Sequence, residues 1–207
     1  MKKFISFEGI DGCGKSTQVK LLEDKLNSEG KKVKLVREPG GLDISEQIRT
    51  ILLNSDNASM TYETEALLMI ASRAQLTDEV IRPLLKRDFY VIADRYADAT
   101  LAYQCYGKGL SADFIDYIHE ESKLLTPDLT FYMDISAKKS KERISHREMD
   151  RMESESLEFF EKVRQGYLEI AVKSPGRVVC LDANKSIEEL KIEILNKTLE
   201  KINAAME

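Results

Sequence analysis

The chain has 207 residues, of which 43% are hydrophobic and 32% are charged, and its formal net charge is −5. This length and this balance suit one α/β domain with a sizeable core, so we expect residues 1–207 to form a single domain. The acidic charge argues against nucleic acid as a partner, because such domains are usually basic. No run of residues is long and apolar enough to span a membrane. We therefore expect a cytoplasmic protein without a nucleic-acid or membrane partner.

Short apolar segments alternate with helical segments along the chain. Near-continuous apolar runs such as residues 89–93 are typical of a parallel sheet covered on both faces. The predicted strands are 4–7, 33–37, 89–93, 129–133 and 178–181. The predicted helices are 15–28, 43–53, 62–86, a segment around 96–106, 112–124, 137–147, 153–173 and 187–203. The pattern predicts an α/β fold, a three-layer sandwich with a five-stranded parallel sheet flanked by helices.

A phosphate-binding loop follows the first predicted strand. Residues 9–16 match the pattern G-x-x-x-x-G-K-[ST] in full. Glycines let successive backbone N–H groups point at a phosphate, and the next helix adds the positive end of its dipole. Lys15 is expected to reach the β- and γ-phosphates of a nucleoside triphosphate, and the Ser16 hydroxyl to contact Mg²⁺. The expected triphosphate-binding residues are Gly9, Ile10, Asp11, Gly12, Cys13, Gly14, Lys15, Ser16 and Thr17.

Polar residues also follow the next two strands. Arg37 and Glu38 end the second, and Asp94 and Arg95 end the third. In open α/β sheets, ligands bind beyond the carboxyl ends of the strands. The sequence therefore predicts one site at this edge, built from three segments that are distant in the chain.

These motifs resemble the thymidylate kinases, a family of nucleoside monophosphate kinases, over nearly the whole chain. The Glu-Pro-Gly-Gly and Asp-Arg-Tyr…Ala-Tyr-Gln segments are more specific signals than the phosphate loop. Besides the loop, the matching motifs are Arg37-Glu38-Pro39-Gly40-Gly41, Glu46-x-Ile48-Arg49, Ala71-Ser72-Arg73-Ala74-Gln75, Asp94-Arg95-Tyr96, Ala102-Tyr103-Gln104 and Asp150-Arg151-Met152-Glu153. The resemblance implies a homodimeric enzyme of dTTP biosynthesis that transfers the ATP γ-phosphoryl group to dTMP with Mg²⁺.

The resemblance also implies roles at the phosphates. It places Ser16 and Asp94 at Mg²⁺, and Lys15 and Arg95 at the transferring group. The phosphates of ATP and dTMP repel each other, and the planar guanidinium groups of several arginines would offset that repulsion.

For the acceptor, the family contacts dTMP through an arginine at the thymine edge, which corresponds to Arg73. The residue four positions earlier is usually Phe, stacked on the base, but here it is Met69. Asp11 matches a contact to the sugar 3′-hydroxyl, and Tyr103 lies where a ring would disfavour a ribonucleotide. The expected dTMP-binding residues are Asp11, Arg37, Pro39, Arg49, Met69, Arg73, Arg95, Thr100, Tyr103 and Gln104.

A basic stretch, residues 138–153, resembles the lid of the family. The family takes its transition-state arginine from the phosphate loop or from the lid. Because this loop has Gly12 and Cys13 in place of an arginine, the lid is expected to supply it. The candidates are Arg143, Arg147 and Arg151.

Three other interpretations remain open. Because Met69 replaces the usual Phe, the chain could instead be a kinase for another monophosphate, such as UMP, CMP or a different deoxynucleotide. A GTPase-like switch would need an Asn-Lys-x-Asp motif that recognises guanine. This chain has Asn184-Lys185-Ser186-Ile187, in which the Asp is absent. A nucleotide-binding module without activity is the third, and measurable turnover would exclude it.

Overall fold

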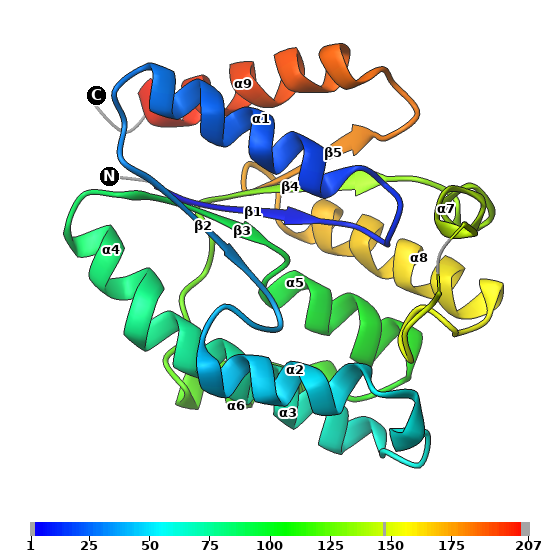
Figure 1. Cartoon of the computed structure of the whole chain (residues 1–207). Coiled ribbons are helices and arrows are strands. Elements are labelled where there is room, and N and C mark those ends of the chain that lie inside the picture. Colours follow the sequence, from blue (N-terminus) through cyan, green and yellow to red (C-terminus); the bar gives the residue numbers. More distant parts are fainter. Residues whose placement is uncertain (1–2, 147, 204–207) are drawn as a thin grey trace.

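A single parallel sheet forms the centre of the computed structural model, which describes residues 3–146 and 148–203 (Figure 1). Its strand order in this part of the chain is β2-β3-β1-β4-β5. The strands are β1 (Phe4–Glu8), β2 (Val33–Arg37), β3 (Tyr90–Asp94), β4 (Leu129–Asp134) and β5 (Val178–Asp182). The five predicted strands are confirmed, with ends that agree to within one residue.

Helices cover both faces of this sheet. Figure 1 shows α1 and α9 on one face and α4, α5 and α8 on the other, so the expected three-layer sandwich is confirmed. The helices are α1 (Lys15–Ser28), α2 (Asp43–Leu53), α3 (Tyr62–Leu76), α4 (Arg82–Lys86), α5 (Ala97–Thr100), α6 (Ala112–Glu121), α7 (Ala137–Ile144), α8 (Leu157–Lys173) and α9 (Ile187–Asn203). Shorter turns are η1 (Ser55–Asn57), η2 (Thr77–Ile81) and η3 (Leu101–Gly107). None of these described helices combines the length and apolarity that crossing a membrane requires.

Five predicted helices differ from the observed ones in their internal geometry or ends. Two of them, 112–124 and 137–147, end earlier than predicted, at Glu121 and at Ile144. The predicted helix 62–86 contains the π-helical turn η2, which lies just before Pro83 in the first turn of α4. Proline lacks an N–H and crowds the preceding turn, so a wider turn accommodates it. The segment 96–106 likewise divides into α5 and the π-helical η3. The helix predicted from 153 begins at Leu157, because the Ser156 side chain caps the N–H of Phe159 at 3.1 Å.

The strand register brings the polar strand ends together. All side chains of β1 are buried, which suits a central strand covered on both faces. Phe7 at the end of β1 pairs with Asp94 of β3, and Asp94 pairs in turn with Arg37 of β2. The loops that follow these three strands therefore leave the sheet at one edge, where the predicted site lies.

Candidate active site

The loop between β1 and α1 is tightly curled. Gly9, Gly12 and Gly14 have φ values of 136°, 80° and 97°, a region that favours glycine. A Cβ atom on Gly9 would lie 2.8 Å from the carbonyl oxygen of Met133, so a side chain does not fit there. The Lys15 ammonium donates to the carbonyl oxygen of Gly9 at 2.7 Å. This curl, followed by the N-terminus of α1, forms a cradle for an anion.

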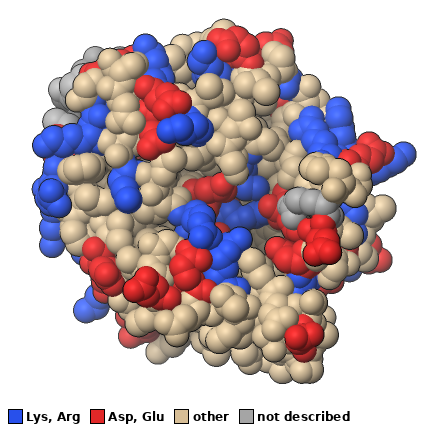
Figure 2. Space-filling model, viewed as in Figure 1, with Lys and Arg blue, Asp and Glu red and all other residues tan. Residues whose placement is uncertain are grey.

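A pocket of about 510 Å³ opens against this loop, and we call it the donor pocket. Figure 2 shows Lys and Arg side chains gathered in a hollow of this face, with acidic side chains beside them. Its lining residues are Asp11, Gly12, Gly14, Lys15, Ser16, Thr17, Arg37, Glu38, Arg49, Asp94, Arg95 and Arg143. The concentration of guanidinium and ammonium groups suits a polyphosphate.

Ser16 and Asp94 are joined in the donor pocket. The Ser16 hydroxyl donates to Asp94 Oδ2 at 2.9 Å, across the loop and the end of β3. Mg²⁺ prefers oxygen ligands and usually takes one or two from the protein, with phosphates and waters supplying the rest. The described residues contain no cluster of three or more His, Cys, Asp or Glu side chains that could hold a metal. The Ser16–Asp94 pair therefore fits a magnesium ion that shares its ligands with a bound phosphate.

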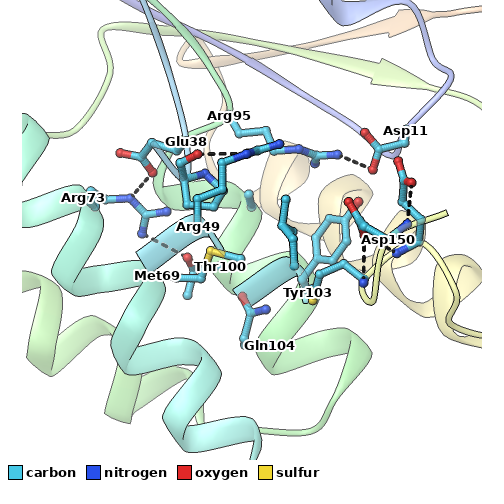
Figure 3. A pocket seen from close by; sticks show the side chains of 15 residues that line it. Asp11, Glu38, Arg49, Met69, Arg73, Arg95, Thr100, Tyr103, Gln104 and Asp150 are labelled. Carbon is cyan, nitrogen blue, oxygen red and sulfur yellow. Dashed lines mark hydrogen bonds and ion pairs between the residues drawn. The ribbon is translucent and has the colours of Figure 1, made fainter. Parts of the chain in front are cut away.

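A second pocket of about 260 Å³ lies beside the first, and we call it the acceptor pocket (Figure 3). The phosphate loop, the loop after β2, α3, the α5–η3 segment and residues 150–153 all contribute to its wall. The lining residues are Asp11, Glu38, Pro39, Arg49, Leu53, Met69, Arg73, Arg95, Ala99, Thr100, Tyr103, Gln104, Asp150, Met152 and Glu153.

Arg73 is held rigidly at one end of the acceptor pocket. Its side chain is 2% exposed, and Nε donates to Glu38 at 2.7 Å. Nη1 donates to the Thr100 hydroxyl at 3.0 Å, and Nη2 donates to the carbonyl oxygen of Tyr96 at 3.0 Å. Figure 3 shows these side chains grouped at one end, with Asp11 and Asp150 at the other. The guanidinium plane is fixed from three sides, so it can orient a ligand.

Two titratable groups contact Arg73. Burial raises the pKa of Glu38 to about 7, although the charge of Arg73 works in the opposite direction. Burial and the charge of Arg73 lower the pKa of His119 to about 3, so its ring is neutral. A neutral ring can accept at Nε2, which lies 3.1 Å from Arg73 Nη1.

Arg95 lies between the two pockets. Its φ of 69° is unusual for a residue with a side chain, and such strained positions concentrate at functional sites. Nη1 donates to the Gly9 carbonyl at 2.8 Å, and Nη2 donates to Asp11 Oδ2 at 2.9 Å. The guanidinium also lies 5.2 Å from the centre of the buried Tyr103 ring. Arg95 therefore ties the phosphate loop to the acceptor pocket.

The end of β2 and helix α2 supply two further arginines, Arg37 and Arg49, on either side of the intervening loop. Arg37 Nη2 donates to Glu46 at 2.6 Å, and Arg49 Nη1 donates to the carbonyl oxygen of Pro39 at 2.9 Å. Gly40 has a φ of 131°, a region that favours glycine, and its backbone lies close to the Glu46 carboxylate. The turn thereby brings both cations to the donor pocket.

The three predicted lid arginines have different positions. Arg143 donates to the carbonyl oxygens of Gly12 at 3.1 Å and Ala183 at 3.2 Å, and it lines the donor pocket. Arg151 donates to the Leu52 carbonyl at 2.7 Å, and within the described chain it lines neither pocket. Arg147 lies outside the described residues. Of the two described lid candidates, the structure brings Arg143 to the phosphate loop.

Sequence reasoning did not assign three carboxylates that line the acceptor pocket: Glu38, Asp150 and Glu153. Asp150 Oδ1 accepts from the backbone N–H groups of Met152 and Glu153, each at 2.9 Å, and shapes that turn. All three residues stand in motifs that carried the family resemblance. The structure shows why Glu38 matters, because the buried Arg73 needs an acidic partner, but no signal in the sequence joins these two residues.

The donor and acceptor pockets meet. Asp11, Glu38, Arg49 and Arg95 line both of them, and these residues form what we call the shared wall. Two cations in this wall would lie between two bound phosphate groups and screen their repulsion.

Comparisons with known proteins agree with this geometry. The sequence model of the family described as thymidylate kinase matches residues 7–194. A thymidylate kinase of Geotalea daltonii is 44% identical, over 97% of this chain and 98% of the relative. Those of Kosmotoga olearia and Thermosipho africanus are 45% and 44% identical, over 95% and 92% of this chain and 95% and 94% of the relatives. The chain belongs to the thymidylate kinase family.

Proposed function

We propose that this chain is a phosphotransferase that transfers the γ-phosphoryl group of ATP to dTMP, giving ADP and dTDP. The observation that carries the proposal is the meeting of the donor and acceptor pockets at a shared wall with two arginines. Phosphoryl transfer depends on aligning the two substrates and stabilising their charge, and this arrangement supplies both. The names of the relatives point to the same reaction.

The transfer needs no covalent enzyme intermediate. A phosphate oxygen of dTMP attacks the γ-phosphorus, the bond from that phosphorus to the bridging oxygen breaks, and ADP leaves. We propose that the phosphate loop and Lys15 bind the ATP phosphates and that Arg143 contacts the γ-phosphoryl group during its transfer. Ser16 and Asp94 would hold Mg²⁺, which when bound neutralises charge on the phosphates.

In the acceptor pocket, we assign Arg37, Arg49 and Arg95 to the dTMP phosphate, with Pro39 shaping that turn. Arg73, Thr100 and Gln104 recognise the base, and the thioether of Met69 packs against its face. Asp11 binds the sugar 3′-hydroxyl, and the Tyr103 ring excludes a 2′-hydroxyl. The positions of these side chains in the two pocket walls support the assignments.

We further propose that residues 138–153 act as the lid of a single domain. In Figure 1, α7 lies beside the loop between β1 and α1. The Ser140 hydroxyl donates to the carbonyl oxygen of Asp11 at 2.5 Å, and a Cβ atom on Gly12 would lie 2.9 Å from the Ser140 carbonyl. This contact places Arg143 where closure would exclude water from the reaction.

A homodimer is supported by exposed apolar side chains on three adjacent helices. Figure 1 shows α2, α3 and α6 grouped on one side of the molecule. Their large exposed residues, which we call the apolar face, are Ile44, Ile51, Tyr62, Leu67, Phe114 and Tyr117. Apolar patches of this kind mark interaction sites, and a second copy of the chain would cover them.

We place the reaction within dTTP biosynthesis, because dTDP is one phosphorylation short of dTTP. We also place it in the cytoplasm. The three cysteines, Cys13, Cys105 and Cys180, are free, which suits a reducing compartment.

A coupled ADP-release assay tests the proposed function. ATP and Mg²⁺ are supplied with dTMP, dUMP, UMP, CMP, dGMP or no acceptor, and Arg73→Ala is assayed in parallel. Strong turnover on dTMP that is lost in Arg73→Ala is the expected result. If the enzyme preferred UMP or CMP, that nucleotide and not dTMP would be assigned as the acceptor. If no acceptor increased ADP release, the kinase assignment would be refuted.

A further inference from the structure

Two rows of side chains, one on α3 and one on the α5–η3 segment, contact each other along one wall of the acceptor pocket. Glu65, Met69 and Arg73 follow one another at intervals of four on α3, and therefore share one face of that helix. Opposite them, Thr100 accepts from Arg73 Nη1 at 3.0 Å, and Gln104 Nε2 donates to Glu65 Oε1 at 2.9 Å. Met69 thus lies in the row between two cross-links, one through Arg73 and one through Glu65.

Glu65 is a buried carboxylate that retains its charge. Its side chain is 1% exposed, and its Oε2 accepts from Lys108 at 3.0 Å and from Arg151. Burial alone would raise the pKa of Glu65, but the hydrogen bond from Gln104, the charge of Lys108 and the hydrogen bonds from Arg151 and Lys108 hold it below its ordinary value. Arg151, expected at the phosphates, is thereby part of the ionic cluster around Glu65.

The charge on Glu65 fixes the orientation of the Gln104 amide. An ionised carboxylate can only accept hydrogen bonds, so Gln104 must turn its NH₂ group toward Glu65. The amide carbonyl, Oε1, then lies on the opposite side. Gln104 lines the acceptor pocket, and within the described residues its Oε1 makes no hydrogen bond. The pocket wall therefore presents an acceptor at Gln104 and one donor at Arg73, the Nη2 N–H that its contacts with Glu38, Thr100, His119 and Tyr96 leave unused within the described chain.

This pattern matches one kind of pyrimidine edge. A 4-oxo pyrimidine such as thymine or uracil carries an acceptor at O4 and a donor at N3–H. Cytosine reverses both, with an amine donor at position 4 and an acceptor at N3. A buried donor facing a donor, or an acceptor facing an acceptor, leaves polar groups unpaired, which strongly disfavours the wrong ligand.

We propose that Glu65 is a positioning residue that locks the Gln104 carbonyl toward the base and so selects 4-oxo over 4-amino pyrimidine monophosphates. The inference rests on the proposed function, because it concerns the acceptor of that reaction. Lys108 and Arg151 serve it by keeping Glu65 charged. Glu65 acts through Gln104 and is not expected to touch the substrate.

The Glu65→Gln variant tests this directly. Lys108 and Arg151 remain and attract the new amide carbonyl, so the new NH₂ group faces Gln104. Gln104 must then present its own carbonyl to that group and its NH₂ to the pocket, which suits the N3 acceptor of cytosine. We expect the ratio of kcat/KM for dTMP to that for dCMP to fall at least tenfold, and dUMP to follow dTMP. If Glu65 contributed only to stability, the variant would lower kcat/KM for all three substrates by the same factor. An unchanged dTMP:dCMP ratio would therefore overturn the proposal.

Two further variants separate positioning from folding. Lys108→Met disturbs the same buried cluster but leaves Glu65 paired with Arg151, so it should lower the melting temperature and keep the dTMP:dCMP ratio within threefold of wild type. In a Gln104→Ala background, Glu65→Gln should change the ratio no further. An independent effect of Glu65→Gln in that background would contradict the proposed route.

If Glu65→Gln does not fold, E65Q/K108M removes the carboxylate together with one of its two cations, and the same ratio change is expected. The activity of the wild-type enzyme separates a failure of the proposed function from a failure of the proposed role of Glu65. Failure of wild type to use dTMP would refute the proposed function, whereas activity on dTMP with no effect of either Glu65 variant on the ratio would refute only this inference.

Discussion

Glu38 and Arg73 form an ion pair at 2.7 Å in which the two side chains are only 3% and 2% exposed. Burial nevertheless raises the pKa of Glu38 to about 7, so its charge changes near neutral pH. When Glu38 is protonated, the charge-assisted hydrogen bond to Arg73 is weakened. Arg73 is then less firmly oriented at the acceptor pocket.

We therefore predict that kcat/KM for dTMP rises as the pH increases through about 7, because the Glu38 carboxylate ionises and fixes Arg73. A pH profile of wild type and Glu38→Gln checks this. The variant should lose this inflection and keep only the one that belongs to the phosphate of dTMP. Identical profiles for the two proteins would contradict the prediction.

The raised pKa of the buried Glu8 should make the free energy of unfolding depend on pH. This residue is fully buried, and burial together with the charge of Asp98 raises its pKa to about 8. Between the ordinary carboxyl pKa and about 8, the folded state holds a proton that the unfolded state has released. The free energy of unfolding should therefore decrease as the pH rises through this window, by about 1.4 kcal/mol per pH unit for one proton.

Urea denaturation between pH 5 and pH 8 measures this slope. Glu8→Gln should reduce it, because the neutral amide has no proton to lose, whereas a matched change at the exposed Glu121, Glu121→Gln, should leave it as in wild type. Equal slopes for all three proteins would rule out Glu8 as the source.

Of the two proposed lid arginines within the described residues, Arg143 is the one that lies at the phosphate loop, with a 3.1 Å hydrogen bond to Gly12. Arg143→Ala should lower kcat by about 10³, since an arginine that stabilises the moving phosphoryl group contributes on that order. Steady-state kinetics with saturating dTMP provide the test, and Lys138→Ala, an exposed cation on the same helix, is the control. A loss of less than tenfold in Arg143→Ala would assign the role elsewhere.

Asp94 should determine how much Mg²⁺ the reaction needs. Asp94→Asn removes the charge beside Ser16, so the Mg²⁺ concentration for half-maximal activity should increase at least tenfold. Ser16→Ala should shift it in the same direction by a smaller factor, because a hydroxyl is a neutral ligand. Titrating Mg²⁺ at fixed ATP distinguishes the variants, and unchanged midpoints would remove both residues from the metal site.

The apolar face predicts the oligomeric state. Leu67 is 46% exposed on α3, and Leu67→Asp would bury a charge in the proposed interface. Sedimentation analysis should show a dimer for wild type and a monomer for this variant. Val172→Asp, at a position that is 81% exposed on α8, should remain dimeric. A wild-type monomer would refute the interface.

Much of the fold could be predicted because local pattern and tertiary environment agree. Strands such as 89–93 are apolar along their length, since the sheet is covered on both faces, and this makes them visible in the sequence. The π-helical turn η2 was not predicted, because apolar spacing alone does not reveal a widened turn before Pro83. Strand order was likewise beyond local pattern, since it depends on contacts between distant segments.

The candidate site was predictable where a motif supplies its residues. The position of Arg151 was not, because Glu65 reaches it from a segment 86 residues away in the chain. Nothing in the local sequence distinguishes an arginine that faces phosphate from one that neutralises a buried carboxylate. Glu38 stayed unassigned for a related reason, because its partner Arg73 is 35 residues away.

The shared wall has a thermodynamic consequence. Because Asp11, Glu38, Arg49 and Arg95 line both pockets, we expect the affinities for the two proposed substrates to be linked. If dTMP changes the affinity for ATP by some factor, ATP must change the affinity for dTMP by that same factor. A substitution in this wall therefore alters both dissociation constants and the coupling between them. Met69 and Gln104 line the acceptor pocket alone, so we expect a substitution at either position to change acceptor binding with less effect on ATP binding than a substitution in the shared wall.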